Sequence, residues 1–485
     1  MGQWDWQKDD VLALYTPNSI DTPAIIWGTH FAGGIVSPAN PAYTVEELAF
    51  QLQNSGAKAL VTQPHLIENA REAARKASLP DNRIILLGDG KDSSLRSQHF
   101  TSLGNTAGLS RYGRVKVNDP AKELAFLVYS SGTTGLPKGV MLTHRNLVSN
   151  LLMGLAGGNN ITSEDRLLAF LPFYHIYGLS GLVHQSLYRG LTCIVMEKFD
   201  LEQWCTMVQK HKITQCYVVP PVILGLSKHP IVDKYDLSSL RMMTSAAAPL
   251  TKELVQTAYK RLGIPITQAY GLSETSPSTH VQPLELWDST IGSVGRLLPN
   301  QTAKYVSGDE KEVSAGQVGE LWVKGPHVFA GYWKNKAATS NALTSDGYFK
   351  TGDIGYQDQD GNFYITDRIK ELIKYKGFQV PPAELEGVLM SHDKVNDVAV
   401  LGVQRDDLAT EVPIAYVVPR PGTATDPQLE KEIVDFVASK VANHKRLRGG
   451  VKFVDEIPKS AAGKILRRVL RDRYTQEEKR RASKL

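Results

Sequence analysis

The sequence predicts an α/β protein with a large N-terminal domain of layered sheets and helices and a small α+β domain at the C-terminus. Its 485 residues exceed what a single hydrophobic core usually organises, so two or more domains are expected. Strand-like and helix-like segments alternate as far as about residue 270, which is typical of a parallel sheet covered by helices. Short strands with turns begin near Val318. The end of the chain alternates again, over a length that can fold alone.

The elements follow from local patterns. Val11–Tyr15 is an apolar run that predicts a strand, and a helical stretch follows it as far as Gly33. Thr44 and Glu47 form the capping-box pattern of a helix start, and Gly56 is expected to end that helix. Further strands are predicted at 59–62, 124–128, 193–196, 215–219, 241–244, 267–270, 319–325, 362–366, 398–401, 414–418 and 451–454, and further helices at 429–441 and 465–474.

Composition excludes several classes of protein. With 42% hydrophobic and 22% charged residues the chain is an ordinary globular protein. Its net charge of +5 is small for the length, which argues against nucleic acid as a partner. The three cysteines, Cys193, Cys205 and Cys216, lie in or near apolar segments and are expected to be reduced packing residues. No apolar run approaches the roughly 18 residues of a membrane span.

A glycine- and hydroxyl-rich loop follows the predicted strand at 124–128. Glycines allow the backbone to approach a ligand closely, and hydroxyls and amides can surround phosphate oxygens. Lys138 adds a positive charge, and the loop lacks the Gly-Lys-Ser/Thr ending of a Walker A motif. We therefore predict a phosphate-binding loop; the alternative is an ordinary surface loop. Its binding residues are Ser130, Ser131, Gly132, Thr133, Thr134, Gly135 and Lys138.

Several motifs in order make the sequence resemble a known family. The loop, read with 268–274, 351–353, 367–371 and 463–464, resembles the adenylate-forming acyl-CoA synthetases, especially 4-coumarate–CoA ligases and firefly luciferase. The resemblance runs from about Asp10 to the C-terminus. It implies an N-terminal adenylation domain over 1–367, a mobile C-terminal domain over 368–485, and a hinge at Lys370. Members of this family usually carry several dozen more residues before the matching segment.

The resemblance implies a nucleotide site built from three motifs. Gln268, Tyr270 and Ser273 would contact ATP, with Tyr270 flanking the adenine. Glu274 would bind Mg²⁺, which prefers one or two carboxylates together with substrate phosphates. Asp353 and Arg368 would hold the ribose. A solvated carboxylate and a surface ion pair are the structural alternatives for these residues.

Acid activation is expected at two further places. Lys464 follows a small-residue loop, and a lysine there can neutralise charge on the reacting carboxylate and α-phosphate. The resemblance makes Lys464 catalytic and places His175 beside the carboxylate, with Tyr177 lining the acyl pocket. Ala246 and Ala269 would also line that pocket, and Ala269 stands where glycine is common. Alternatively, Lys464 is a solvated lysine and His175 a core histidine.

The second half-reaction is assigned by resemblance alone. Lys374 and Gln379 would act at the thioester step, and Lys198, Lys376 and Gly377 would contact coenzyme A. Lys464 and Lys374 would lie on opposite faces of the small domain, so that rotation about Lys370 exchanges them at the site. An amphipathic segment with solvated lysines is the alternative.

We therefore expect an ATP-dependent acyl-CoA ligase with ATP, Mg²⁺ and coenzyme A as cofactors or substrates. The acid is expected to be aryl, phenylpropanoid or medium-chain. Alternatives are a stand-alone adenylation enzyme that loads a carrier protein, an inactive nucleotide-binding module and, less favoured, a luciferase-like monooxygenase. Ser483-Lys484-Leu485 matches the tripeptide read by the peroxisomal import receptor, which predicts a peroxisomal protein.

Overall fold

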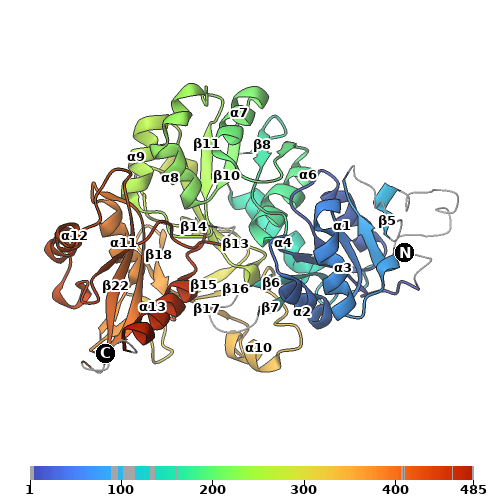
Figure 1. Cartoon of the computed structure of the whole chain (residues 1–485). Helices are drawn as coiled ribbons and strands as arrows, with labels where there is room; N and C mark the ends of the chain where they lie inside the picture. The colour runs from blue at the N-terminus through green and yellow to red at the C-terminus, as the bar shows by residue number, and fades with distance from the viewer. Residues whose placement is uncertain are drawn as a thin grey trace.

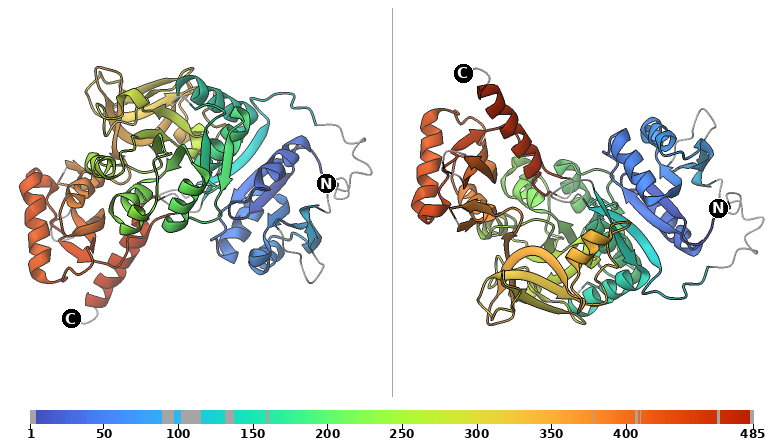
Figure 2. Two further views of the ribbon diagram at one scale, coloured as in Figure 1. Left: turned by 90° about the horizontal axis from the view of Figure 1, so that it is seen from above. Right: turned by 90° about the horizontal axis from the view of Figure 1, so that it is seen from below.

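The structure is a computed structural model that describes residues 5–88, 97–101, 115–130, 137–158, 161–376, 378–405, 408, 410–460 and 463–482. The elements of the N-terminal part gather toward the right of Figure 1 and those of the C-terminal part toward the left, with a second sheet region between them. The views from above and below in Figure 2 agree with this division. Within the described residues we find no helix long and apolar enough to cross a membrane.

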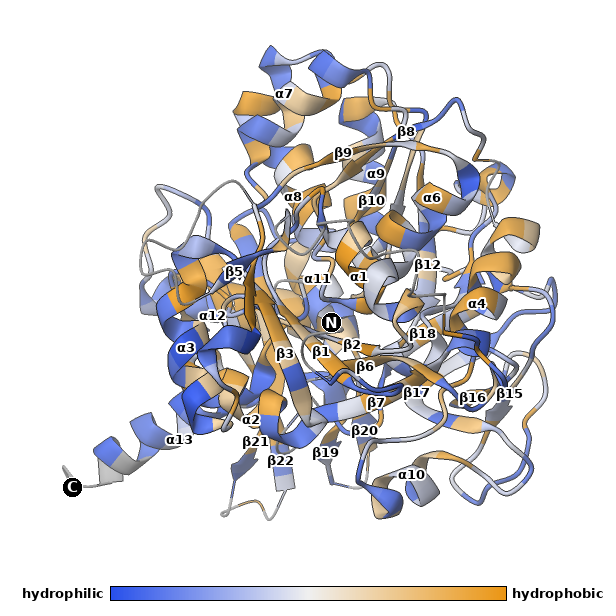
Figure 3. Cartoon of the chain, turned by 90° about the vertical axis from the view of Figure 1, so that its right-hand side faces the viewer, coloured by the Kyte–Doolittle hydropathy of each residue, from blue (hydrophilic) through white to orange (hydrophobic). Residues whose placement is uncertain are grey.

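The first sheet has seven strands in the order β5-β4-β3-β1-β2-β6-β7. They are parallel except for β7, which pairs antiparallel with β6. Figure 3 shows the apolar interior of this sheet beside the polar outer face of α3. The strands are β1 (Val11–Tyr15), β2 (Ile35–Ala39), β3 (Ala57–Thr62), β4 (Ile84–Leu86), β5 (Gln98–His99), β6 (Leu124–Ser130) and β7 (Lys138–Thr143), and the helices between them are α1 (Thr22–Phe31), α2 (Val45–Ser55) and α3 (Ile67–Lys76).

The second sheet also has seven strands, in the order β14-β13-β12-β11-β10-β8-β9. It is parallel from β9 to β12 and antiparallel from there to β14. Its strands are β8 (Arg166–Ala169), β9 (Thr192–Val195), β10 (Gln215–Val218), β11 (Met242–Ser245), β12 (Ile266–Gly271), β13 (Ser278–Val281) and β14 (Arg296–Leu297). The helices of this region are α4 (His144–Gly157), α5 (Ile176–Gly178), α6 (Gln185–Arg189), α7 (Leu201–His211), α8 (Pro220–Lys228) and α9 (Lys252–Leu262).

Antiparallel pairing dominates the rest of the chain. A four-stranded sheet is formed by β15 (Thr302–Val306), β16 (Gly319–Lys324), β17 (Phe349–Gln357) and β18 (Phe363–Arg368), with α10 (Lys336–Ala342) inserted before β17. The hairpin of β19 (Ile373–Tyr375) and β20 (Phe378–Val380) comes next. The last sheet contains β21 (Val395–Arg405), β22 (Thr410–Pro419) and β23 (Val451–Phe453), together with α11 (Pro382–Met390), α12 (Pro427–Lys440) and α13 (Arg467–Ala482).

The buried apolar side chains separate near the end of β18. The largest cluster spans residues from Leu12 to Phe363, whereas a second cluster spans Ile373 to Leu470. The small C-terminal part therefore has a hydrophobic core of its own, as the sequence leads one to expect. The boundary between 367 and 368 remains a prediction.

Local signals placed α2 correctly. Thr44 Oγ1 accepts the Glu47 amide at 3.3 Å, and Glu47 Oε2 accepts the Thr44 amide at 2.8 Å. Gly56 ends the helix in the left-handed region, with a φ of 73°. The three cysteines are free; Cys205 and Cys216 are buried and Cys193 is half-buried, in agreement with the predicted packing role.

Candidate active site

The predicted phosphate loop connects two antiparallel strands. Ser130 ends β6 and pairs in register with Lys138, the first residue of β7. Lys138 Nζ lies 5.1 Å from the ring centre of Tyr332. The predicted contacts Ser131, Gly132, Thr133, Thr134 and Gly135 lie outside the described residues.

Tyr270, Asp353 and Arg368 form one connected group. Asp353 and Arg368 are register partners on β17 and β18, and Arg368 Nε lies 3.0 Å from Asp353 Oδ1. The Tyr270 hydroxyl, from the end of β12, donates to Asp353 Oδ2 at 2.5 Å. Burial, followed by the Asp353 charge, raises the pKa of Tyr270 well above its usual value. The side chain of Asp353 is only 3% exposed, so this is not the solvated ion pair considered as the alternative.

Glu274 adds a second carboxylate beside this group. It lies with Ser273 on a short 3₁₀ turn that follows β12. Glu274 Oε1 accepts the hydroxyl of Tyr332 at 2.8 Å, which links it to the tyrosine that Lys138 approaches. The negative charge of Glu274 also favours the protonated guanidinium of Arg368 and so helps to raise the Arg368 pKa, after Asp353, which is the main cause.

The backbone of Gln268 is held by two hydrogen bonds to Gln282, whereas its side-chain nitrogen is left without a partner in the part of the chain that the structure describes. Its amide donates to Gln282 Oε1 at 2.9 Å, and its carbonyl accepts the Gln282 amide at 2.8 Å. Gln268 is 6% exposed, and its Nε2 is buried without a hydrogen-bond partner among the described residues. A buried amide of this kind is costly unless a ligand satisfies it.

Lys464 approaches the group from the small domain. Gly463 has a φ of +77°, and a Cβ built on it would lie 2.9 Å from the ring of Pro221, at the start of α8. Gly463 therefore lies close against the large domain, and only glycine fits this position without a shift. Burial, and next the charge of Arg368, lowers the pKa of Lys464 to about 8.

His175 lies near the same lysine. Its Nδ1 accepts the Tyr177 amide at 3.3 Å, at the start of the short helix α5. Burial, followed by the positive charge of Lys464, lowers the pKa of His175 to about 4. The imidazole is therefore neutral at physiological pH, and it can bond a carboxylate oxygen only through a ring N–H.

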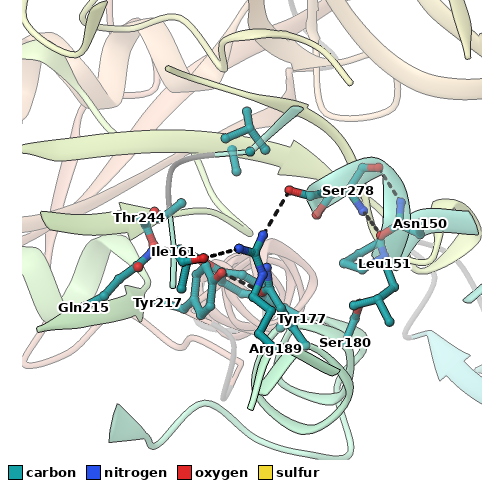
Figure 4. A pocket seen from close by; sticks show the side chains of 17 residues that line it. Asn150, Leu151, Ile161, Tyr177, Ser180, Arg189, Gln215, Tyr217, Thr244 and Ser278 are labelled. Carbon is teal, nitrogen blue, oxygen red and sulfur yellow. Dashed lines mark hydrogen bonds between the residues drawn. The ribbon is translucent and has the colours of Figure 1, made fainter. Parts of the chain in front are cut away.

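A cavity of about 70 Å³ opens between α4, α6 and the second sheet. Its lining includes Tyr177, Arg189, Gln215, Tyr217 and Ala269, of which the first four are labelled in Figure 4. Two of the four predicted acyl-binding residues, Tyr177 and Ala269, line it. His175 and Ala246 are not among its described lining residues; Ala246 lies just after β11.

The residues predicted for the thioester step lie elsewhere. Lys374 and Gln379 are register partners on the β19–β20 hairpin, and both are exposed. Lys198, Lys370 and Lys376 are exposed as well. Gly377 lies outside the described residues. The structure thus brings Lys464, and not Lys374, to the group around Asp353.

Comparison with known proteins decides the family. The AMP-binding enzyme family matches residues 3–333, and the AMP-binding enzyme C-terminal domain matches residues 384–464. The first match alone covers more than half of the chain. The chain belongs to the AMP-binding enzyme family.

This AMP-binding enzyme is similar to named proteins over nearly its whole length. It is 40% identical over 482 residues to a protein named probable 4-coumarate–CoA ligase 1 from Dictyostelium discoideum, covering 96% of this chain and 86% of that protein. It is 37% identical over 477 residues to 4-coumarate:CoA ligase 1 from Petunia hybrida, covering 96% and 85%. The crystal structure of ATP-bound MatB from Rhodopseudomonas palustris matches with a TM-score of 0.85 at 30% identity, over 98% of this chain and 90% of that one. The predicted family and fold class are confirmed.

Sequence reasoning missed several residues of this AMP-binding enzyme. Tyr332 joins Lys138 to Glu274, but it lies in a loop without a motif that would single it out. Arg189 and Gln215 line the cavity from α6 and β10, and their positions depend on how helix and sheet pack together. The roles predicted for the site residues in binding ATP, acid and coenzyme A all remain predictions.

Proposed function

We propose that this AMP-binding enzyme is an acid–CoA ligase. It activates a carboxylic acid with ATP to an acyl-adenylate and pyrophosphate, and coenzyme A then displaces AMP to give the thioester. The observation that carries the proposal is that Lys464 lies close enough to the Asp353–Arg368 pair for both charges to act on its pKa, although the sequence places the three residues in separate motifs. The names of the relatives as 4-coumarate–CoA ligases support the same reaction.

The residues around Asp353 suit the first half-reaction. The carboxylate of Asp353 can accept hydrogen bonds from both ribose hydroxyls, while Arg368 orients it. Lys464 can place its ammonium between the acid carboxylate and the α-phosphate, where charge is redistributed during transfer. Catalysis of this kind depends on orientation and charge stabilisation more than on covalent help from the protein.

Glu274 is the proposed Mg²⁺ ligand. Mg²⁺ usually takes one or two carboxylates and completes its shell with water and substrate phosphates. The donor chemistry fits, because Glu274 is a half-buried carboxylate whose Oε1 accepts the Tyr332 hydroxyl. When bound with ATP, the ion would neutralise phosphate charge.

The proposal also covers the acid substrate and the residues that contact coenzyme A. We propose an aryl, phenylpropanoid or medium-chain acid, because Tyr177 forms an aromatic wall of the cavity. The proposed contacts of the thioester step are Lys374, Gln379, Lys198, Lys376 and Gly377.

The proposal also covers the location of the protein. Ser483-Lys484-Leu485 lies outside the described residues, and we propose that it directs the protein to peroxisomes. A fluorescent fusion at the N-terminus should be peroxisomal, and the same fusion without these three residues should not be.

The test of function is pyrophosphate release with cinnamic, benzoic, phenylacetic and fatty acids, each with and without coenzyme A. We expect release that depends on the acid and thioester that forms only with coenzyme A. Lys464→Ala should lower release by about 100-fold or more, as the loss of a group that stabilises transition-state charge does. Lys431→Ala, at an exposed lysine of α12, is the matched control.

Other outcomes would favour the other functions. Thioester formation only on a phosphopantetheine carrier protein would indicate a carrier-loading enzyme. ATP binding without pyrophosphate release from any acid would indicate an inactive nucleotide-binding module. Undiminished release by Lys464→Ala would remove the proposed role of Lys464.

A further inference from the structure

Arg189 brings a positive charge to the wall of the cavity. It is the last residue of α6, and its Nη1 donates to the carbonyl of Ile161 at 2.5 Å. Its Nη2 makes a longer contact of 3.5 Å to the carbonyl of Gly154. A guanidinium has five N–H donors, so these two contacts leave donors unused.

No carboxylate pairs with Arg189 in the part of the chain that the structure describes. Asp165 is the carboxylate whose charge acts on it, but Asp165 Oδ1 lies 2.5 Å from Arg241 Nη2 and accepts the Thr214 hydroxyl at 2.6 Å. The Nε of Arg189 is buried and has no partner among the described residues. Burial lowers the pKa of Arg189 accordingly.

Gln215 also lines this cavity, and its side-chain oxygen has no hydrogen-bond partner among the described residues. Residues two apart on a strand lie on one face, so Gln215 and Tyr217 both line the cavity from β10. The Tyr217 hydroxyl donates to Gln185 Oε1 at 2.7 Å, whereas Gln215 Oε1 is buried without a partner among the described residues. Gln215 itself is only 1% exposed.

These unsatisfied groups require an explanation. A buried polar group without a partner costs free energy, and native proteins keep few of them. An apolar acyl chain in the cavity would leave the Arg189 charge and the Gln215 carbonyl unpaired. A ligand oxygen in this cavity could accept from Arg189, and a ligand hydroxyl could donate to Gln215 Oε1, because both residues line it.

We propose that the acid carries an oxygen-bearing substituent away from its reacting carboxyl group, and that Arg189 and Gln215 select it. This inference rests on the proposed function, because it takes the cavity as the acyl site. A hydroxyl and a second carboxylate share the required chemistry as acceptors of hydrogen bonds. The oxygen-bearing substituent is distinct from the reacting carboxyl group, because Lys464 and His175 are the residues that would bind the reacting carboxyl group.

The experiment compares acids that share one skeleton. Hexanoate, 6-hydroxyhexanoate and adipate form one series, and cinnamate, 4-hydroxycinnamate and 4-carboxycinnamate form the other. We expect the natural protein to prefer one oxygen-bearing member of a series by about 10- to 100-fold in kcat/KM for pyrophosphate release, as hydrogen bonds to charged groups allow. The hydroxy and carboxy members distinguish the two kinds of substituent.

Arg189→Met should abolish this preference, because kcat/KM for the oxygen-bearing acid should fall by more than kcat/KM for the apolar acid. Gln215→Leu should reduce the preference for the hydroxyl in particular, and it tests the cavity again if Arg189→Met does not fold. Arg261→Met is the matched control, because Arg261 also donates from a helix to a backbone carbonyl, that of Leu226, but does not line the cavity.

Binding of the same acids, measured by calorimetry, separates this inference from the proposed function. Acid binding with an Arg189-dependent oxygen preference, but without pyrophosphate release, would overturn the proposed function and support the cavity assignment. Release without any oxygen preference, or a preference that survives in both variants, would overturn the cavity assignment alone. Failure of every acid to bind would overturn both.

Discussion

The environment of the site changes the protonation of Lys464. Burial and the neighbouring Arg368 lower its pKa to about 8, whereas an unperturbed lysine has a pKa of about 10.4. The ammonium is therefore lost as the pH rises through about 8. His175, with a pKa of about 4, stays neutral over the same range.

A pH profile tests the charge on Lys464. Because the proposed role needs the ammonium, kcat/KM for ATP, which reports the free enzyme, should fall as the pH rises through about 8. In Lys464→Arg the guanidinium stays charged, so this descending limb should disappear even though the maximal rate is lower. A limb at the same pH in both proteins would assign it to another group.

The Asp353 carboxylate is expected to hold the ribose of ATP. Asp353→Asn keeps the shape of the side chain but removes the negative charge that pairs with Arg368 and accepts the hydrogen bond from Tyr270. Calorimetry should show ATP binding weakened by about 10-fold or more, the usual size for a hydrogen bond to a charged group. Asp346→Asn, in an exposed turn, is the control and should bind ATP normally. Equal ATP affinity in the two variants would contradict the ribose assignment.

At the scale of single elements, α2 offers a local test. Thr44→Ala removes the oxygen that accepts the Glu47 amide and should lower the free energy of local opening by about 1 kcal/mol. Hydrogen exchange of the first α2 amides should therefore become faster. Thr44→Ser keeps the acceptor and should exchange nearly as the natural protein does. Unchanged exchange in Thr44→Ala would mean that packing of Leu48 and Leu52 alone holds this end of the helix.

The elements that could be predicted are those with local causes. The capping box, the αL glycine and the apolar strands are set by side chains a few residues apart, so α2, β1 and β6 follow from the sequence. The sheet order does not, because its pairings join distant residues, as Val36 on β2 does with Phe126 on β6. The antiparallel edges, β7 on the first sheet and β13 and β14 on the second, were not predicted for the same reason.

The candidate site divides in the same way. Motifs located Tyr270, Glu274, Asp353, Arg368 and Lys464, and the structure brings these residues together. Arg189 and Gln215 have no motif, since only the packing of α6 against β10 gives them a common cavity. The lowered pKa of Lys464 could not be predicted from the sequence either, because the burial of Lys464 depends on how the small domain packs against Pro221.

At the scale of the whole molecule, the two half-reactions should respond to different lysines. Lys464→Ala should lose acyl-adenylate formation, whereas Lys374→Ala, at an exposed hairpin position, should retain it and lose transfer to coenzyme A by about 10-fold or more. A single-turnover experiment that follows pyrophosphate and thioester separately makes the distinction. If Lys374→Ala forms thioester at the natural rate, rotation about Lys370 does not bring Lys374 to the site.

The position of Arg368 has a mechanical consequence. It ends β18 two residues before Lys370 and pairs with Asp353 on β17, whereas Lys464 follows the last sheet of the small domain. The proposed hinge therefore separates the two residues along the chain. A rotation of the small domain about Lys370 would carry Lys464 away from the site and leave Arg368 paired with Asp353. AMP would then stay bound until the thioester has formed and leave after it.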